Sequence, residues 1–596
     1  MDDRTEAQNR AVFAGRLAIG LVQGLALYFL NLAFTDKTWP ATDGFLYAPL
    51  LFVSLYVPLI VSIGIGNLRA ATLVTWTLAA SALVAAAAWY AIWQWPVEWA
   101  GIDDHPRIVP EFALFFFTLV GLYIAHVLIS AADSERRWLA QYPAYFDCAW
   151  KFLLQGVLSA CFVGVFWGVL ELGAALFSII GLDGFRTFIE HRWFAVPATT
   201  LAFAAALHVT DVRVGLIRGV RSLGLALLSW LLPLMAALAA AFLVGLVFTG
   251  LKPLWDTRFA AGDLLTASAV LVILINAAFQ DGSQEHRPAA VLRISGSLAA
   301  LLLMPLVALS AYAVALRVGQ YGWTTDRVNS VGCLVVAGFL AIGYALAAIP
   351  MGPWLGRLAR LNILAAFLGL LVIIALFSPI ADPMRIAVDS QMARLAKGSV
   401  KAEAFDYGYL RWRSGRFGLD ALHRLEHWEG PQASYVRDKA HAILNYHVMA
   451  YTAPIAQDLA DNFIVYPAGR KLPSAFLHQD WLHDPDASSL PACLTTAGVG
   501  CQAFFLDLAG DGHEEIVVIG TDKSGTITGS NGVFAEDEKG VWHLTGRPNE
   551  LWQCPVVLKA LKRGDFSLAP PLTAAREVDV HGTHLTIDRL SQACPN

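Results

Sequence analysis

Long uncharged apolar stretches fill the first two thirds of this 596-residue chain and constrain its fold more than any other feature. A helix that crosses a bilayer needs about 20 apolar residues, because it advances by only about 1.5 Å per residue. Eleven stretches meet this requirement, at residues 13–34, 46–66, 70–94, 110–131, 150–181, 193–210, 222–249, 261–280, 290–316, 328–349 and 360–380. We therefore expect an α-helical polytopic membrane domain over residues 1–381.

The distribution of charge separates this domain from the rest of the chain. Hydrophobic residues make up 57% of the sequence and charged residues 15%, which excludes an ordinary soluble protein. Pro379 and Pro383 end the last apolar stretch, and from Asp382 onward charged and turn residues reach the density of a globular domain. No Lys/Arg tract indicates nucleic-acid binding. We expect a helical segment over residues 382–490 and a small β-rich domain over residues 491–596.

Lysine and arginine residues predict the orientation, because cytoplasmic links carry the excess of positive charge. With the N-terminus inside, thirteen of them fall in inner segments and eight in outer segments. This bias predicts a cytoplasmic N-terminus. After an odd number of crossings, the C-terminal domain is expected outside the cytoplasmic membrane.

Four of the seven cysteines lie in the C-terminal domain, namely Cys493, Cys501, Cys554 and Cys594. An even set of this kind suits an oxidising compartment, and we expect disulfides between Cys493 and Cys501 and between Cys554 and Cys594. Their spacing does not resemble a zinc site. The alternative is four free thiols in a cytoplasmic domain.

Of the charged residues within the predicted spans, Glu171 and Arg16 are the two most informative. A carboxylate inside a membrane helix is costly unless it is protonated, paired or facing water. Glu171 could line a pathway for protons or cations, but we favour a helix-packing carboxylate near the outer surface. Arg16 lies near the inner end of its helix, so its side chain can reach the interface by snorkelling.

Small and polar residues in the spans predict contacts between helices. G-x-x-x-G steps at residues 20–24 and 164–168 allow a second helix to approach closely. Asn276 and Asn362 can hydrogen-bond across a helix interface.

Three segments together resemble a known family. They are "QYGWTTDRV" at residues 320–328, "SPIADPMRIAVDSQMARLAKGSV" at residues 378–400 and "FDYGYLRWRSGRFGLDAL" at residues 405–422. Following a set of hydrophobic helices, they resemble the bacterial polytopic membrane family catalogued as domain of unknown function 4153. The resemblance implies a bacterial inner-membrane protein with an extracytoplasmic C-terminal region, and it implies no catalytic residue.

The segment that follows the membrane domain has helical periodicity up to about Trp481. Within it, Arg411, Arg413 and Arg416 alternate with aromatic residues. These arginines could bind anionic lipid headgroups or envelope glycans. We favour a structural role in which they attach this segment to the membrane domain. In the link before residue 328, Thr324 or Thr325 can cap the following helix.

After Pro491 the pattern changes to short β-rich runs separated by turns, which predicts a mainly antiparallel unit. It contains "DLAGDGHEE", which resembles a short calcium loop with Asp507, Asp511 and Glu515 as ligands. Ala509 replaces one oxygen ligand. We therefore favour a structural turn over a Ca²⁺ site at this loop.

No H-E-x-x-H, G-x-S-x-G or Walker motif occurs. The first functional hypothesis is therefore a non-enzymatic envelope protein that binds, senses or scaffolds, with the bilayer and possible envelope proteins or anionic lipids as partners. The second is a transporter or lipid-handling protein with a polar pathway near Glu171. A membrane transferase would need acidic residues to converge, and Glu111, Glu190 and Asp263 are its scattered candidates.

Overall fold

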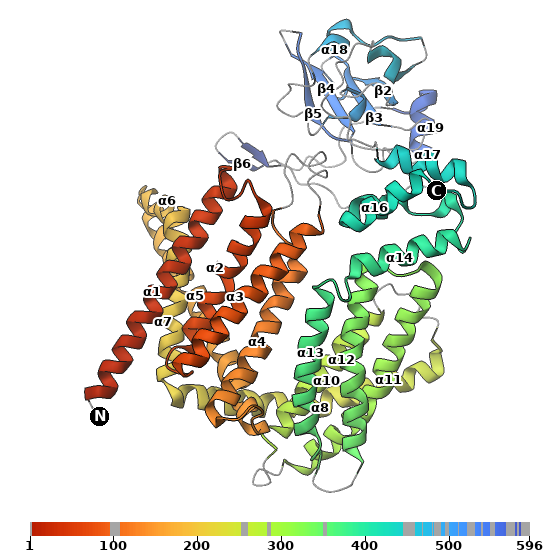
Figure 1. The fold of residues 1–596 in the computed structure, drawn as a ribbon. Helices are drawn as coiled ribbons and strands as arrows, with labels where there is room; N and C mark the ends of the chain where they lie inside the picture. Colours follow the sequence, from red (N-terminus) through yellow and green to blue (C-terminus); the bar gives the residue numbers. More distant parts are fainter. Residues whose placement is uncertain are drawn as a thin grey trace. The chain divides into compact units, whose positions relative to one another are not determined.

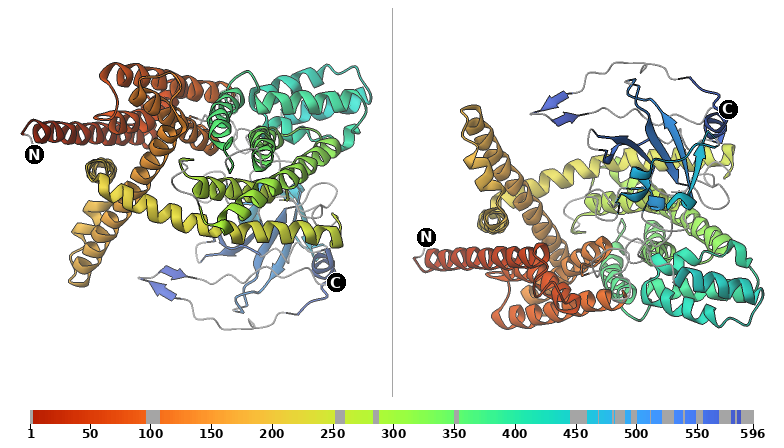
Figure 2. Two further views of the ribbon diagram at one scale, coloured as in Figure 1. Left: turned by 90° about the horizontal axis from the view of Figure 1, so that it is seen from below. Right: turned by 90° about the horizontal axis from the view of Figure 1, so that it is seen from above.

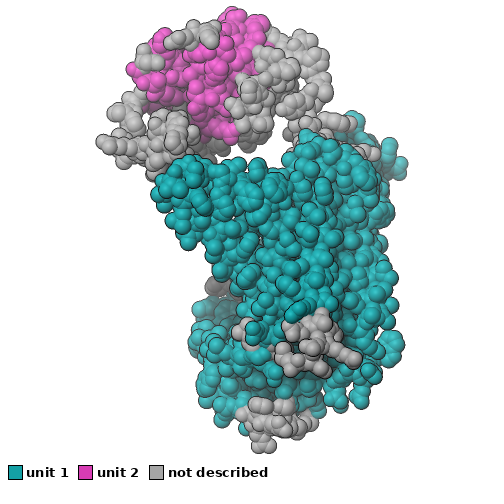
Figure 3. All heavy atoms as spheres, turned by 90° about the vertical axis from the view of Figure 1, so that its left-hand side faces the viewer, with its two compact units in different colours: residues 1–445 teal, residues 446–596 magenta. Residues whose placement is uncertain are grey.

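The computed structural model describes residues 3–95, 108–251, 260–282, 288–349, 354–444, 459–467, 469–479, 481, 490–494, 500–510, 512–520, 531–537, 540–548, 555–567, 578–580 and 583–585. The chain forms two compact units, of residues 1–445 and 446–596 (Figure 3). The three-part division at residues 381 and 490 stays a prediction.

Eleven helices in the described part of unit 1 are long and apolar enough to cross a membrane, which confirms the fold expected from the sequence (Figure 1). They are α1 (Asp3–Thr35), α2 (Gly44–Gly64), α3 (Ala70–Trp93), α4 (Phe112–Glu135), α5 (Tyr142–Ile179), α7 (Arg192–Val212), α8 (Val214–Thr249), α10 (Ala260–Phe279), α11 (Ala290–Tyr321), α12 (Thr325–Ala348) and α13 (Leu358–Leu376). The short helix α6 (Gly184–Glu190) lies between α5 and α7.

These helices pack around separate apolar cores, so we describe them as two bundles. In the first bundle, α1 packs against α2 and α7, α2 against α3, and α5 against α4 and α7. In the second bundle, α8, α10, α11, α12 and α13 share one core that includes Leu271, Leu303 and Tyr344. In Figures 1 and 2, α8 crosses α11 and α12 obliquely. The bundles meet where α4 contacts α13 and where α5 contacts both α13 and α8.

Four helices follow the membrane part within unit 1. They are α14 (Pro383–Ala396), α15 (Tyr407–Arg413), α16 (Gly415–Glu426) and α17 (Ala433–Leu444). Asp382 caps α14 and Asp406 caps α15, because each carboxylate accepts hydrogen bonds from backbone N–H groups of the first turn. The four helices share a core around Leu410, Leu422 and Val436. We call residues 382–444 the platform.

Unit 2 contains a five-stranded sheet in the order β1-β2-β3-β4-β5. Its strands are β1 (Phe463–Tyr466), β2 (Cys501–Leu506), β3 (Glu515–Gly520), β4 (Gly532–Glu536) and β5 (Trp542–Gly546), and a separate pair joins β6 (Val578–Val580) to β7 (Thr583–Leu585). β1 pairs with β2 in parallel, whereas β2 to β5 are antiparallel. All residues of β3 are buried, as expected of a central strand covered on both faces.

Both faces of the sheet are packed. On one face, Ile516 and Phe534 contact Phe476 and Trp481, from α18 (Ser474–His478) and the residues after it. On the other face, Val517 and Ile519 lie in a cluster with Leu558 and Leu561 of α19 (Pro555–Arg563). The strand β1 lies before residue 491, within the segment for which the sequence predicted only helices.

Candidate functional site

The attachment of the platform begins at Asp382, which is fully buried. Its Oδ1 accepts hydrogen bonds from the backbone N–H groups of Met384 (2.8 Å) and Arg385 (3.1 Å), which caps α14. Its Oδ2 accepts hydrogen bonds from the hydroxyl of Tyr90 (2.5 Å) and the side-chain amide of Gln94 (2.6 Å), both at the C-terminal end of α3. One carboxylate therefore starts the platform and ties it to a membrane helix.

A second attachment lies at the same end of α3, where the last carbonyl groups of the helix need donors. The backbone N–H of Arg416 donates to the carbonyl oxygen of Gln94 (2.7 Å), and its Nε donates to the carbonyl oxygen of Trp93 (3.1 Å). The guanidinium group also lies 4.7 Å from the centre of the Trp93 ring. A cation at a helix C-terminus is favoured by the helix dipole. A Cβ at Gly415 would lie 2.3 Å from the Gln94 oxygen, so only glycine permits this approach.

The third attachment joins α14 to the C-terminal end of α11. Arg394 donates to the carbonyl oxygens of Gly319 (3.3 Å) and Gln320 (2.8 Å). Gln391 donates to the carbonyl oxygens of Tyr321 and Trp323 (2.9 Å each). The platform therefore supplies donors to the carboxyl ends of two membrane helices.

Gly322 lies in the link between α11 and α12 at φ +77°, and a Cβ there would lie 2.6 Å from Arg394. The N-terminal end of α12 differs from the sequence expectation. Neither threonine side chain caps it; instead the backbone N–H of Thr325 donates to the hydroxyl of Tyr409 on α15 (3.2 Å). The three segments that carry the family resemblance thus contact one another in space.

Of the three arginines singled out in the sequence, Arg416 contacts the membrane part. Arg411 is buried in α15, whereas Arg413 is exposed. Binding of headgroups or glycans by these residues stays a prediction.

Within the platform, Glu426 of α16 accepts hydrogen bonds from His441 of α17 (3.0 Å) and His423 (3.2 Å). These contacts, that of His441 above all, lower the pKa of Glu426. Both histidines are more than half exposed, so the pair links α16 to α17 only weakly.

A second polar cluster joins α1, α2, α5 and α7. It lies on the side of the membrane part that faces away from the platform. Arg16 is 1% exposed, so the expectation that it snorkels to the interface is wrong. Its guanidinium donates to Asp211 Oδ2 (2.7 Å), to the carbonyl oxygens of Ser62 (2.9 Å) and Ile65 (3.0 Å), and to His208 Nδ1 (3.4 Å). A buried charge that is paired with a carboxylate and makes four hydrogen bonds needs no contact with water.

Asp211 is the centre of this cluster. Lys151 pairs with its Oδ1 (3.0 Å), and Gln155 donates to the same oxygen (3.0 Å). Lys151 also donates to Asn67 Oδ1 (2.6 Å). The cluster joins four helix ends. It was missed in the sequence because Asp211 lies just beyond its apolar stretch, 195 residues from Arg16.

Glu171 lies apart from both sites, on an exposed stretch of α5. A Cβ added at Gly164 or Gly168 would meet no described atom within 4 Å, so the prediction of a close helix at this G-x-x-x-G step is wrong for the described chain. At Gly24, by contrast, an added Cβ would lie 2.4 Å from Thr200 Oγ1 and 2.5 Å from the Cα atom of Pro197 on α7. The step in α1 does bring a second helix close.

The loop considered for calcium in unit 2 is held by its own backbone. Asp507 accepts hydrogen bonds from the N–H groups of Gly510 (2.7 Å) and Gly512 (3.2 Å), both at positive φ. The buried carboxylate of Glu515 accepts one from Leu508 (2.7 Å). Asp511 lies outside the described residues, and within those residues no group of three metal-binding side chains forms a site. The Ca²⁺ site stays a prediction.

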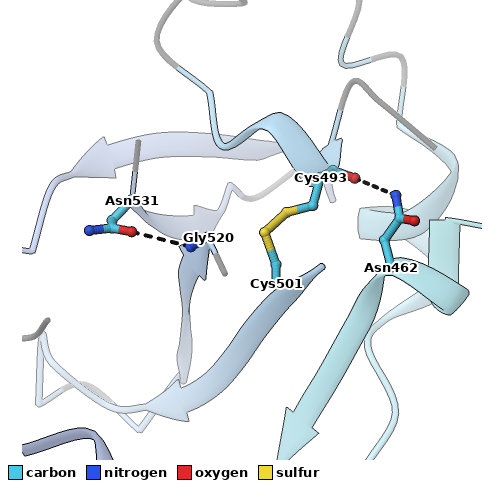
Figure 4. The surroundings of a disulfide bond; sticks show 5 residues. All are labelled: Asn462, Cys493, Cys501, Gly520 and Asn531. Atoms are coloured by element: carbon cyan, nitrogen blue, oxygen red, sulfur yellow. Dashed lines mark hydrogen bonds between the residues drawn. A yellow bond between two sulfur atoms is a disulfide. The ribbon is translucent and has the colours of Figure 1, made fainter. Parts of the chain in front are cut away.

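The disulfide between Cys493 and Cys501 is confirmed (Figure 4). Both cysteines are buried in the core of the sheet, and the amide of Asn462 donates to the carbonyl oxygen of Cys493 (2.9 Å). The second predicted pair, Cys554 and Cys594, lies outside the described residues.

Comparison with known proteins gives a family and no relative of known function. No curated protein and no solved structure matches the chain. The family described as "Domain of unknown function (DUF4153)" matches residues 47–426, from α2 to the end of α16. The match therefore includes the membrane helices that hold the platform and the three platform helices that contact them. Because it covers more than half of the 596 residues, the chain belongs to this family of domains of unknown function.

Proposed function

We propose that this protein is a non-enzymatic scaffold of the bacterial inner membrane, whose platform is an extracytoplasmic surface fixed to the ends of the membrane helices. The observation that carries the proposal is the triple attachment of the platform, through Asp382, Arg416 and Arg394. Each attachment uses a charged side chain against buried or helix-end polar groups. Such contacts are stronger than neutral hydrogen bonds and fix orientation.

The proposed sidedness rests on the charge bias combined with the number of spans and, independently, on the disulfide. The excess of Lys and Arg on the inner links favours a cytoplasmic N-terminus. Eleven candidate spans then lead to the outside. The disulfide between Cys493 and Cys501 is typical of proteins in an oxidising compartment.

The second hypothesis, transport along a pathway at Glu171, has less support from the contacts. A cluster of charged and amide side chains surrounds Arg16 and Asp211, and Glu171 is not part of that cluster. Most polar groups of the Arg16 cluster hydrogen-bond to one another, which suits a structural role for it.

Sidedness is tested with alkaline phosphatase fused after Asn596 and, as a control, after Asp281 in the link between α10 and α11. We expect activity from the first fusion only, because the enzyme requires export to the periplasm. Activity only from the fusion at Asp281 would reverse the proposed orientation.

The scaffold role predicts an envelope-integrity defect in a deletion strain, and it is tested by complementation of that strain. We expect Glu171→Gln to complement, and the double variant Asp382→Ala/Arg416→Ala not to complement while still reaching the membrane at the wild-type level. Asp389→Ala, on the exposed face of α14, is the matched control. Failure of Glu171→Gln together with success of the double variant would favour transport instead.

A further inference from the structure

A pocket of about 260 Å³ lies inside the membrane part, where α4 and α5 of the first bundle face α10 and α13 of the second. We call it the junction pocket, and its walls include Tyr123, Tyr142, Phe146, Trp150, Asn276 and Asn362. The walls are mainly apolar and aromatic, with a few polar groups on one side. This is the composition of a small-molecule site.

The polar side of the junction pocket is a hydrogen-bonded network. Asn362 Nδ2 donates to Asn276 Oδ1 (2.6 Å) and to the hydroxyl of Tyr142 (3.1 Å). Asn276 Nδ2 donates to the hydroxyl of Tyr344 (2.8 Å) and to the carbonyl oxygen of Val272 (2.9 Å). The Tyr344 hydroxyl donates to Asn362 Oδ1 (2.5 Å). Each amide therefore uses both of its N–H bonds within the protein.

Two donors remain on the pocket wall. The Tyr142 hydroxyl accepts a hydrogen bond in this network, but its own O–H meets no acceptor among the described residues. The indole N–H of Trp150, two turns along the same helix, also finds no acceptor in the described part of the chain. A ligand that fits this pocket needs an apolar body and an oxygen acceptor at one end.

The depth of the pocket indicates the source of such a ligand. Tyr142 is the first residue of α5, Asn276 lies in the last turn of α10, and Asn362 lies near the start of α13. These helix ends place the two donors near the membrane interface, where Tyr and Trp are enriched and where lipid ester groups lie. We propose that the junction pocket binds one acyl chain of a membrane lipid, with an ester carbonyl oxygen at the hydroxyl of Tyr142.

The volume sets the size of the bound part. A dry cavity of about 150 Å³ is large enough for benzene, whereas sites for whole drug-sized ligands begin at about 300 Å³. The junction pocket is intermediate, so it takes a segment of a chain and leaves the headgroup outside. This inference is independent of the scaffold role, since the platform contributes no residue to the pocket.

The test uses the full-length protein in vesicles of phosphatidylethanolamine and phosphatidylglycerol that contain a phosphatidylcholine with a diazirine on its acyl chain. Photolysis and peptide mapping then locate the labelled residues. We expect concentrated labelling of peptides that contain residues 123–128 and 142–150. Labelling spread evenly along the lipid-exposed helices would overturn the proposal.

Variants separate the pocket from the surrounding bilayer. Ala366→Phe fills the pocket from α13 and is expected to reduce labelling at least tenfold, whereas Leu364→Phe, on the exposed side of the same helix, leaves it within twofold. If gel filtration shows that Ala366→Phe does not fold, Ala149→Phe fills the pocket from α5 in its place. Undiminished labelling in a folded filling variant would refute the site.

The polar contact has its own variant, Tyr142→Phe, which removes the free O–H and keeps the ring. Loss of one hydrogen bond is expected to weaken labelling by about two- to tenfold. Labelling equal to that of the wild type would refute the assignment of the ester oxygen to Tyr142.

Discussion

Replacement of Asp382 by alanine is the sharpest perturbation of the platform, because one carboxylate serves both the first turn of α14 and the end of α3. In the wild type, this buried side chain accepts hydrogen bonds from two backbone N–H groups and from the side chains of Tyr90 and Gln94. Asp382→Ala removes all four and leaves Tyr90 and Gln94 without their shared acceptor.

The cost can be worked from these contacts. Loss of an N-cap costs about 0.5–2 kcal/mol. A hydrogen bond to a charged group contributes about 1.5–3 kcal/mol, and such contributions do not add fully when they share one group. We expect the free energy of local opening of the platform to fall by about 3–5 kcal/mol, the range for a broken buried polar network. Since about 1.4 kcal/mol is a factor of ten, amide exchange should accelerate by about 100- to 4,000-fold.

The assay is hydrogen–deuterium exchange of the full-length protein, read by mass spectrometry on peptides from residues 383–396 and 407–426. Asp382→Asn retains the cap and is expected to accelerate exchange by about tenfold, because amide oxygens also cap helices well. Asp389→Ala, exposed on α14, should stay within about twofold. Exchange in Asp382→Ala at the wild-type rate would show that this carboxylate does not hold the platform.

Three further predictions concern other contacts. Gly24→Ala should lower the thermal stability of the detergent-solubilised protein by about 1–3 kcal/mol through overpacking against α7, whereas Gly164→Ala, in the equivalent but open step of α5, should not lower it. In unit 2, the hydrogen bond from Arg470 lowers the pKa of Glu514 from its ordinary value of 4.5, so the pair stabilises the sheet above pH 4.5 and this contribution is lost as the pH falls through the lowered pKa. Glu514→Gln should therefore make reduction of the buried disulfide by a phosphine about twofold faster at pH 7, and this difference from the wild type should shrink as the pH falls below 4.5, since an exposed pair contributes below about 1 kcal/mol; a ratio that does not change with pH would contradict this. Replacing both Cys493 and Cys501 by alanine should destabilise unit 2 by about 2–3 kcal/mol, measured by urea-dependent proteolysis of the full-length chain, and an unchanged midpoint would count against a stabilising disulfide.

The membrane part was predictable because its signal is local. Each span needs only a run of apolar residues, and all eleven predicted stretches correspond to candidate membrane helices whose ends differ by up to eight residues. The strand Glu515–Gly520 was predicted for the same reason, since a short β-rich run bounded by turns is complete in itself.

The contacts between segments were not predictable in this way. The two G-x-x-x-G steps are alike in sequence, but only the step in α1 has a partner helix, and α7 is about 170 residues away. The strand Phe463–Tyr466 depends on parallel pairing with β2, which no local pattern shows.

The candidate site was predicted in part. The arginines around residue 411 were singled out, and Arg416 does contact α3. In the sequence, Asp382 indicates only a domain boundary, although an acidic residue followed by proline is a typical helix start. Its partners Tyr90 and Gln94 lie 292 and 288 residues away in the sequence, so the pattern around Asp382 could not reveal them.

The central claim, that the platform is fixed to the membrane helices, is tested most directly by one distance measurement. Nitroxides coupled to a genetically encoded keto amino acid at Asp326 on α12 and Asp420 on α16 occupy exposed positions on the two sides of the attachment. Pulsed electron–electron resonance in lipid nanodiscs should give one narrow distance distribution in the wild type and a broad one in the Asp382→Ala/Arg416→Ala variant. A broad distribution in the wild type would contradict the account.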